Sequence, residues 1–83
     1  MIHVVASHEG PNTVLYITRE GSFNRRIPTE IRLEMTQWMF GHWGQPNEEN
    51  AWEFYDQIDY MTVRLHDPDR AVELRMRWHG VEC

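Results

Sequence analysis

The hydrophobic pattern is clearest in the last third of the chain, residues 59–78. Apolar residues alternate with polar ones on both sides of the segment DPDR at 67–70, first at Met61, Val63 and Leu65 and then at Val72, Leu74, Met76 and Trp78. A period of two is typical of half-buried strands, and Asp and Pro favour a tight reversal. The pattern predicts a C-terminal β-hairpin in which Val63 faces Leu74, Arg64 faces Glu73 and Tyr60 faces Arg77.

A second hairpin is predicted at the start of the chain. Residues 2–6 form a short apolar run, residues 13–19 are rich in β-branched and aromatic side chains, and a cluster of turn-forming residues separates them. After the reversal at Glu20 and Gly21, residues 22–27 are predicted to return as a third strand, with Val14 opposite Ile27. The polar stretch at 24–26 leaves an edge or a loop as the alternative.

A helix is predicted at 29–42, with Thr29 as its N-cap. One face carries Ile31, Met35, Trp38, Met39 and His42 at helical spacing, and it is expected to pack on the sheet. Leu33 and Phe40 lie on the opposite side, so a second element or a partner is expected to cover them. The helix is predicted to end at Gly41 or Gly44.

A short acidic helix is predicted near 48–57, with Asn47 as its N-cap. On a helical wheel Glu49, Glu53 and Asp56 form an acidic stripe at i, i+4 and i+7, opposite an apolar side. The competing interpretation is a strand through residues 52–54, in which Trp52 and Phe54 alternate with Glu53.

Together these elements predict an α+β fold in one compact domain, residues 1–83. Its antiparallel sheet has four to five strands in the order β-β-(β)-α-α-β-β, with the 29–42 helix on one face. Hydropathy shows no membrane span and no secretory signal, and the single cysteine, Cys83, favours a reducing, cytoplasmic location. The net charge of −5 is local, because residues 43–69 hold seven acidic residues against Arg64 alone.

No arrangement of reactive side chains predicts catalysis. Ser7, Ser22 and Cys83 lack an evident base, no metal-ligand spacing links the five histidines, and the glycines are too scattered to hold a phosphate. His3 and His8, across the first turn, are the one loose metal candidate. We therefore predict a non-enzymatic protein with no catalytic residue, no metal and no cofactor.

Two charged surfaces and one aromatic residue are the candidate partner-binding sites. The first surface is acidic, on the predicted helix and its neighbours: Glu48, Glu49, Glu53, Asp56 and Asp59. The second is the outer face of the predicted C-terminal hairpin, with Tyr60, Arg64, Arg75 and Arg77. Trp43, between Gly41 and Gly44 at the end of a stretch dense in large apolar residues, is the aromatic candidate for an exposed anchor.

The acidic surface favours a protein-binding function. Carboxylates spaced along one ridge can present negative charge to a basic groove, as mimics of nucleic acid do. In size, local acidity and lack of catalytic motifs the chain resembles small inhibitors encoded by viruses and mobile elements, which implies a host-cell protein as partner. The predicted partner is thus another protein, such as a basic nucleic-acid-handling complex, with a homodimer as a further option. The alternative function is direct binding of nucleic acid by the hairpin arginines, although Glu73 and the net negative charge oppose it.

Overall fold

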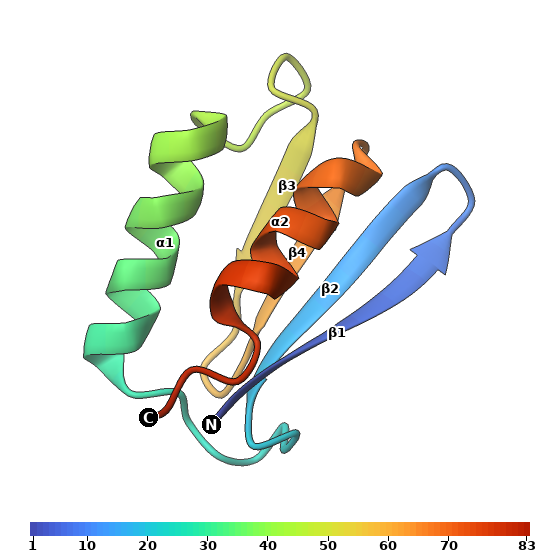
Figure 1. Cartoon of the computed structure of the whole chain (residues 1–83). Coiled ribbons are helices and arrows are strands. Elements are labelled where there is room, and N and C mark those ends of the chain that lie inside the picture. The colour runs from blue at the N-terminus through green and yellow to red at the C-terminus, as the bar shows by residue number, and fades with distance from the viewer.

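The computed structural model describes all residues, 1–83, as a four-stranded antiparallel sheet with two helices (Figure 1). The elements in chain order are β1 (Ile2–Glu9), β2 (Asn12–Arg19), α1 (Thr29–Trp43), β3 (Trp52–Asp56), β4 (Met61–Leu65) and α2 (Pro68–Trp78). The strand order in the sheet is β1-β2-β4-β3, so the chain is two successive ββα units that meet at the β2–β4 pair. The α+β class and the antiparallel sheet agree with the sequence prediction, whereas the order of elements differs from it.

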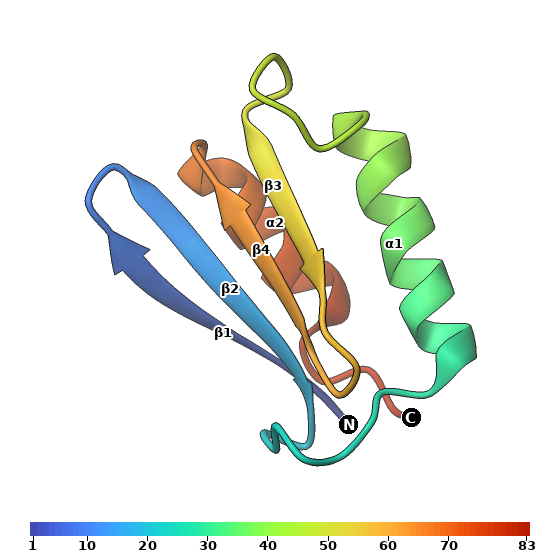
Figure 2. The ribbon, with the colours of Figure 1, turned by 180° about the vertical axis from the view of Figure 1, so that it is seen from behind.

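Both helices lie on the same face of the sheet, as the two opposite views show (Figures 1 and 2). Helix α2 contacts β1, β2 and β4. Helix α1 reaches β3 through Phe40 and Trp43, whose rings lie 5.6 and 5.3 Å from the ring of Trp52. Fifteen buried residues from all six elements and the loop before α1 form one hydrophobic core between the helices and the sheet. Neither helix has the length and apolar composition needed to cross a membrane.

The N-terminal hairpin is confirmed, and its strands are longer than predicted. Eight residues of β1 pair with eight of β2, from Ile2 opposite Arg19 to Glu9 opposite Asn12. Only Gly10 and Pro11 remain for the turn. Gly10 has a φ of +60°, a conformation that glycine adopts without steric cost, so the turn can close in two residues.

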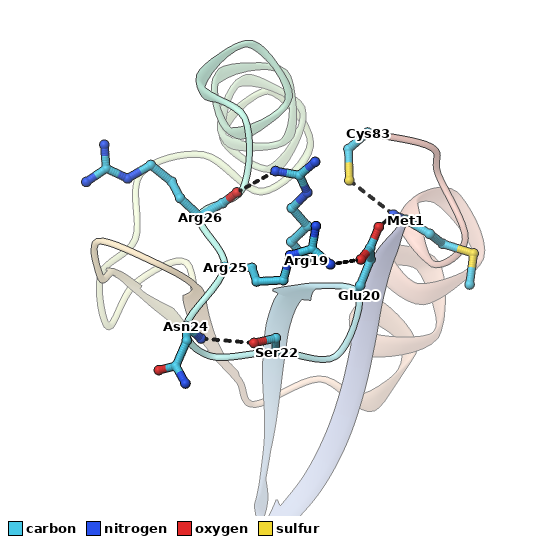
Figure 3. Close-up of polar contacts among 8 residues, drawn as sticks. All are labelled: Met1, Arg19, Glu20, Ser22, Asn24, Arg25, Arg26 and Cys83. Atoms are coloured by element: carbon cyan, nitrogen blue, oxygen red, sulfur yellow. Dashed lines mark hydrogen bonds and ion pairs between the residues drawn. The ribbon is translucent and has the colours of Figure 1, made fainter.

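The predicted third strand at 22–27 is wrong. Residues 22–27 form a loop with a single bridge between Ser22 and Arg19, and Ile27 is buried without pairing with Val14. Local polar contacts replace strand pairing (Figure 3). Arg25 pairs with Glu20, the Asn24 N–H donates to Ser22 Oγ at 3.2 Å, and Arg19 donates to the carbonyl of Arg26 at 3.5 Å. The polar groups of residues 24–26 thus find hydrogen-bond and ion-pair partners in or next to the loop.

The terminal residues lie beside this loop. The amine of Met1 donates to Cys83 Sγ at 3.2 Å, and its nitrogen lies 3.5 Å from Oε1 of Glu20 (Figure 3). The guanidinium of Arg25 is the largest influence on Glu20 and lowers the pKa of that carboxyl below its ordinary value of 4.5.

The helix predicted at 29–42 is confirmed as α1. The N-cap is Pro28 rather than the predicted Thr29, and no side chain makes a capping hydrogen bond to the first turn. Met35 and Met39 are buried on the predicted face, while Ile31 and Trp38 are partly buried against the core. On the opposite side, Phe40 is covered by β3, and Leu33 remains 56% exposed.

The acidic helix predicted at 48–57 is wrong, and the alternative strand forms instead. β3 is short and pairs with β4 along its whole length. Trp52 is fully buried on the inner side and Glu53 points to the other side, as a period of two requires. Pairing with β4 and burial of Trp52 against α1 outweigh the weak helical preference of the acidic segment, because local propensity is small compared with tertiary packing.

The first strand of the predicted C-terminal hairpin is confirmed as β4, but its second strand is wrong, because residues 68–78 form α2. The segment DPDR starts the helix: Asp67 Oδ1 accepts a hydrogen bond from the Asp69 N–H at 2.9 Å, and Pro68 occupies the first turn. Ala71, Leu74 and Trp78 are buried at i, i+3 and i+7. The predicted pairs of Arg64 with Glu73 and of Tyr60 with Arg77 therefore do not exist.

Candidate functional site

The candidate site is the face of the sheet that neither helix covers, which we call the open face. Inner-facing strand residues such as Val4, Ile17, Met61 and Val63 are fully buried, and their strand neighbours point to the open face. Figure 2 shows the strands from this side with the helices behind them. The open face carries His3, Val5, Ser7 and Glu9 from β1, Val14, Tyr16 and Thr18 from β2, Thr62 and Arg64 from β4, and Glu53 and Tyr55 from β3.

One row across the open face is apolar and aromatic. Strand register places Val5 beside Tyr16, Tyr16 beside Thr62 and Thr62 beside Tyr55, so the row crosses all four strands. Its two ends are the most open, with Val5 53% and Tyr55 48% exposed. Exposed Val and Tyr in one line make a surface suited to contact rather than to solvation alone.

An aromatic cluster extends this row at the end of the sheet near the loop after β2. The ring of Phe23 lies 6.2 Å from that of Tyr16 and 4.8 Å from that of Tyr60, both edge to face. Phe23 is 50% exposed. Mutual packing holds the three rings in place, so a partner would meet a pre-organised aromatic surface.

The next row of the open face is polar and centred on Arg64. Ser7, Val14, Arg64 and Glu53 are neighbours across the four strands. The guanidinium of Arg64 lies 3.1 Å from Oε2 of Glu9 and 3.5 Å from Oε2 of Glu53. Glu9 belongs to the neighbouring row, so two carboxylates flank one cation, and this cluster of three side chains has a net negative charge.

A pocket of about 390 Å³ opens at the polar end of the open face. It is lined by Asn12, Pro46, Asn47, Glu48, Trp52, Glu53, Arg64 and His66. Oδ1 of Asn12 is buried and has no hydrogen-bond partner in the chain. With Glu48 and Glu53, this acceptor makes the pocket rich in hydrogen-bond acceptors, which suits a donor-bearing or cationic group.

Four of the residues predicted from the sequence lie at this site. Glu48, Glu53 and Arg64 line the pocket, and Tyr60 belongs to the aromatic cluster at the other end. The predicted acidic ridge does not form, because Glu53 and Asp56 lie on opposite faces of β3.

The other predicted site residues lie elsewhere. Asp56 pairs with Arg32 of α1, Trp43 is only 6% exposed because it packs on Trp52, and Arg75 and Arg77 are on α2. Glu49 and Asp59 are in the loops that flank β3, outside the lining of the pocket. The predicted Arg-rich hairpin face does not form, because Arg64 lies on the sheet and Arg75 and Arg77 lie on a helix.

Sequence reasoning missed the residues that make the open face continuous: Val5, Glu9, Asn12, Tyr16, Phe23, Tyr55 and His66. The alternation of Val14, Tyr16 and Thr18 against Leu15 and Ile17 was a usable signal, but both sets are apolar enough to be buried. The predicted pairing of His3 with His8 does not form, because both lie on β1 and an offset of five positions puts them on opposite faces of the sheet. The ring of His3 instead lies 5.4 Å from that of His79.

The comparisons with known proteins leave the site to be interpreted from its own geometry. No protein-family model matches the chain, and no curated protein and no solved structure matches it.

Proposed function

We propose that the protein is a non-catalytic binding module that contacts another protein through its open face. The observation that carries this proposal is the apolar row with half-exposed Val5 and Tyr55 at its ends, on the face of the sheet that neither helix covers. An antiparallel sheet that only faces water usually alternates apolar residues inside with polar residues outside. Apolar and aromatic residues on the outer side favour a protein interface.

The charges of the open face favour a basic segment of the partner. Glu9 and Glu53 flank the guanidinium of Arg64 at the polar end, and Glu48 adds a third carboxylate to the lining of the pocket. A lysine or arginine side chain entering the pocket would meet these carboxylates and the free Oδ1 of Asn12. Where this basic segment is the nucleic-acid-binding surface of the partner, occupying it inhibits that partner, which is the role we propose.

Capture of partners from nuclease-treated extract of native host cells tests the proposal. The immobilised protein is compared with the double variant Val5→Lys/Tyr55→Lys, which places charge at both ends of the apolar row. Both positions are exposed on edge strands, where lysine is well tolerated, so the fold is retained. We expect the captured proteins to be lost with the double variant, and nuclease treatment excludes capture through bound nucleic acid.

Leu33→Lys is the matched control, because Leu33 is 56% exposed but lies on α1, away from the open face. It should capture the same proteins as the unmodified chain. The proposal would be contradicted if the unmodified chain and both variants captured the same proteins equally. It would also be contradicted if no captured protein depended on the open face. The contribution of the pocket is measured by Glu53→Gln, which should weaken binding of the captured partner more at low salt than at high salt.

A further inference from the structure

The outer edge of β1 is covered by the end of the chain over its first half. The Ile2 N–H donates to the carbonyl of Val81, and the Gly80 N–H donates to the carbonyl of Ile2, both at 2.7 Å. The Val4 N–H donates to Nδ1 of His79 at 2.9 Å. Gly80 and Val81 thus pair with Ile2 as a short strand would. The side chain of His79 accepts a hydrogen bond from Val4, whose N–H is the next one on this edge.

The second half of the same edge is free. In an antiparallel strand alternate residues direct their N–H and C=O to the same side, so those of Ala6 and His8 point outward like those of Ile2 and Val4. β1 pairs only with β2, and no other backbone group bonds to Ala6 or His8 on the outer side. Residues 5–9 contain neither Lys nor Pro, the residues that commonly protect an exposed edge.

An exposed apolar flank of α2 lies beside this edge. A groove of about 460 Å³ is lined by Val72, Arg75, Met76 and His79, with Val72 56% and Met76 82% exposed. The contact of His79 with Val4 shows that this flank of α2 faces the outer edge of β1. Arg70, on the other flank, donates to the carbonyl of Asn50 and faces the loop before β3.

We infer that a second copy of the chain occupies this edge, with the two β1 strands antiparallel about a two-fold axis at Ser7. This axis places Ala6 opposite the partner's His8, and each pair exchanges two N–H···O=C bonds, so the two pairs supply four. Val4 would face only the partner's Gly10, which follows the end of the partner's strand. The new pairing therefore stops where the tail begins.

The exposed stripe of α2 is self-complementary under the same symmetry. A two-fold axis at the height of Leu74 places Val72 opposite the partner's Met76 and Asp69 opposite the partner's His79. Asp69 forms none of the ion pairs within the chain, so its carboxylate is available. Nδ1 of His79 accepts from Val4, so its proton is on Nε2, which can donate to the partner's Asp69. This self-complementarity selects a second copy over an unrelated strand.

The two symmetry positions lie at similar heights along the edge. α2 runs back along β1 from the contact of His79 with Val4 (Figure 1). At a rise of 1.5 Å per helical residue, Leu74 lies about 7–8 Å from His79. At 3.3 Å per strand residue, Ser7 lies about 10 Å from Val4. One axis can therefore relate both pairs of elements.

The resulting dimer has one eight-stranded sheet with its four helices on one side. Its two open faces form a continuous surface, so the dimer would present the binding site proposed above twice. The edge formed by β3 offers a shorter surface for strand pairing, because β3 has only five residues. Helix α1 also lies beside it, linked by the ion pair of Arg32 with Asp56.

Mass in solution, measured by light scattering after size exclusion over a range of concentrations, tests this inference. The chain has a mass of 10.0 kDa, and we expect twice that mass at high concentration. Val72→Lys and Met76→Glu each place a charge against an apolar side chain of the partner in both symmetric pairs, and each should raise the Kd of the dimer by about tenfold. The double variant brings each new lysine opposite the partner's new glutamate and should restore the dimer.

The double variant is the matched control, because it adds one charge of each sign, so that the net charge is unchanged, and both positions are exposed. His8→Pro removes an outward N–H from the free edge and should also weaken the dimer. A monomer at every concentration, or a dimer that ignores these changes, would overturn the inference. So would a dimer broken by Tyr55→Lys, because Tyr55 is on the open face of β3, at the opposite edge of the sheet from β1.

Discussion

The two faces of the sheet use the same four strands but have opposite roles. In β1, Val4 is fully buried under α2, whereas the adjacent Val5 is 53% exposed on the open face. In β2, Leu15 and Ile17 are fully buried, whereas Tyr16 between them is only partly buried. The inner face is largely apolar, whereas the open face combines an apolar row with charged and hydroxyl-bearing residues, and the helices cover only the inner face. Stability is concentrated on the inner face, which leaves the open face available for binding.

The sharpest test of this comparison is the same substitution at two adjacent residues. Val4→Thr places a hydroxyl group in the core without a partner, and we expect it to lower the free energy of unfolding by about 1–3 kcal/mol. Val5→Thr keeps the β-branched shape at an exposed position and should change that free energy by less than about 0.5 kcal/mol. Urea unfolding measures both values. Equal losses would mean that the two faces are equally buried in solution.

Helix α2, which covers part of the inner face, can be destabilised at its N-terminus. Asp67→Ala removes the carboxylate that accepts from the Asp69 N–H, and we expect a loss of about 1 kcal/mol in the free energy of unfolding. Asp67→Asn keeps an acceptor at the cap and should lose much less. If the two variants were equally stable, Asp67 would not cap a helix, and the predicted hairpin at 60–79 would again have to be considered.

The smallest effect is expected at Glu20, which lies outside both faces. Its pKa in the folded protein is lowered, chiefly by Arg25, below the ordinary 4.5, so its ionised form stabilises the fold. This contribution is present above pH 4.5 and is lost as the pH falls through the lowered pKa. The difference in Tm between the unmodified chain and Glu20→Gln should therefore be positive at neutral pH and shrink in acid. Solvent screening keeps this difference small. A difference that does not change with pH would exclude the Arg25 pair as its cause.

Local patterns were sufficient for the elements whose signal points to one structure. The N-terminal hairpin, the 29–42 helix and the strand at β4 were predicted because their side-chain periods fit only one element. The pattern of the segment after DPDR fits both a strand and a helix. Val72, Leu74, Met76 and Trp78 alternate as in a strand, but Ala71, Leu74 and Trp78 also have helical spacing, and Asp-Pro opens either a turn or a helix.

The site was predicted only in its residue types. Glu48, Glu53, Tyr60 and Arg64 were named from charge and aromatic content, and all four lie at the open face or its pocket. Their geometry was wrong, because Glu53 was placed on a helix and Arg64 opposite Glu73. The actual neighbours of Arg64, which are Glu9 and Glu53, come from strands 55 and 11 residues away in the chain.

The sequence by itself determined the α+β class, the antiparallel pairing of the first two strands and the local acidity. Each of these follows from the side-chain period or the composition of a short segment. The tertiary structure decided that residues 68–78 are a helix, that 52–56 are a strand and that no helix covers one face of the sheet. These outcomes depend on contacts between distant segments, chiefly Trp52 against α1 and α2 over β1 and β2, and no short window of sequence contains both partners of such a contact.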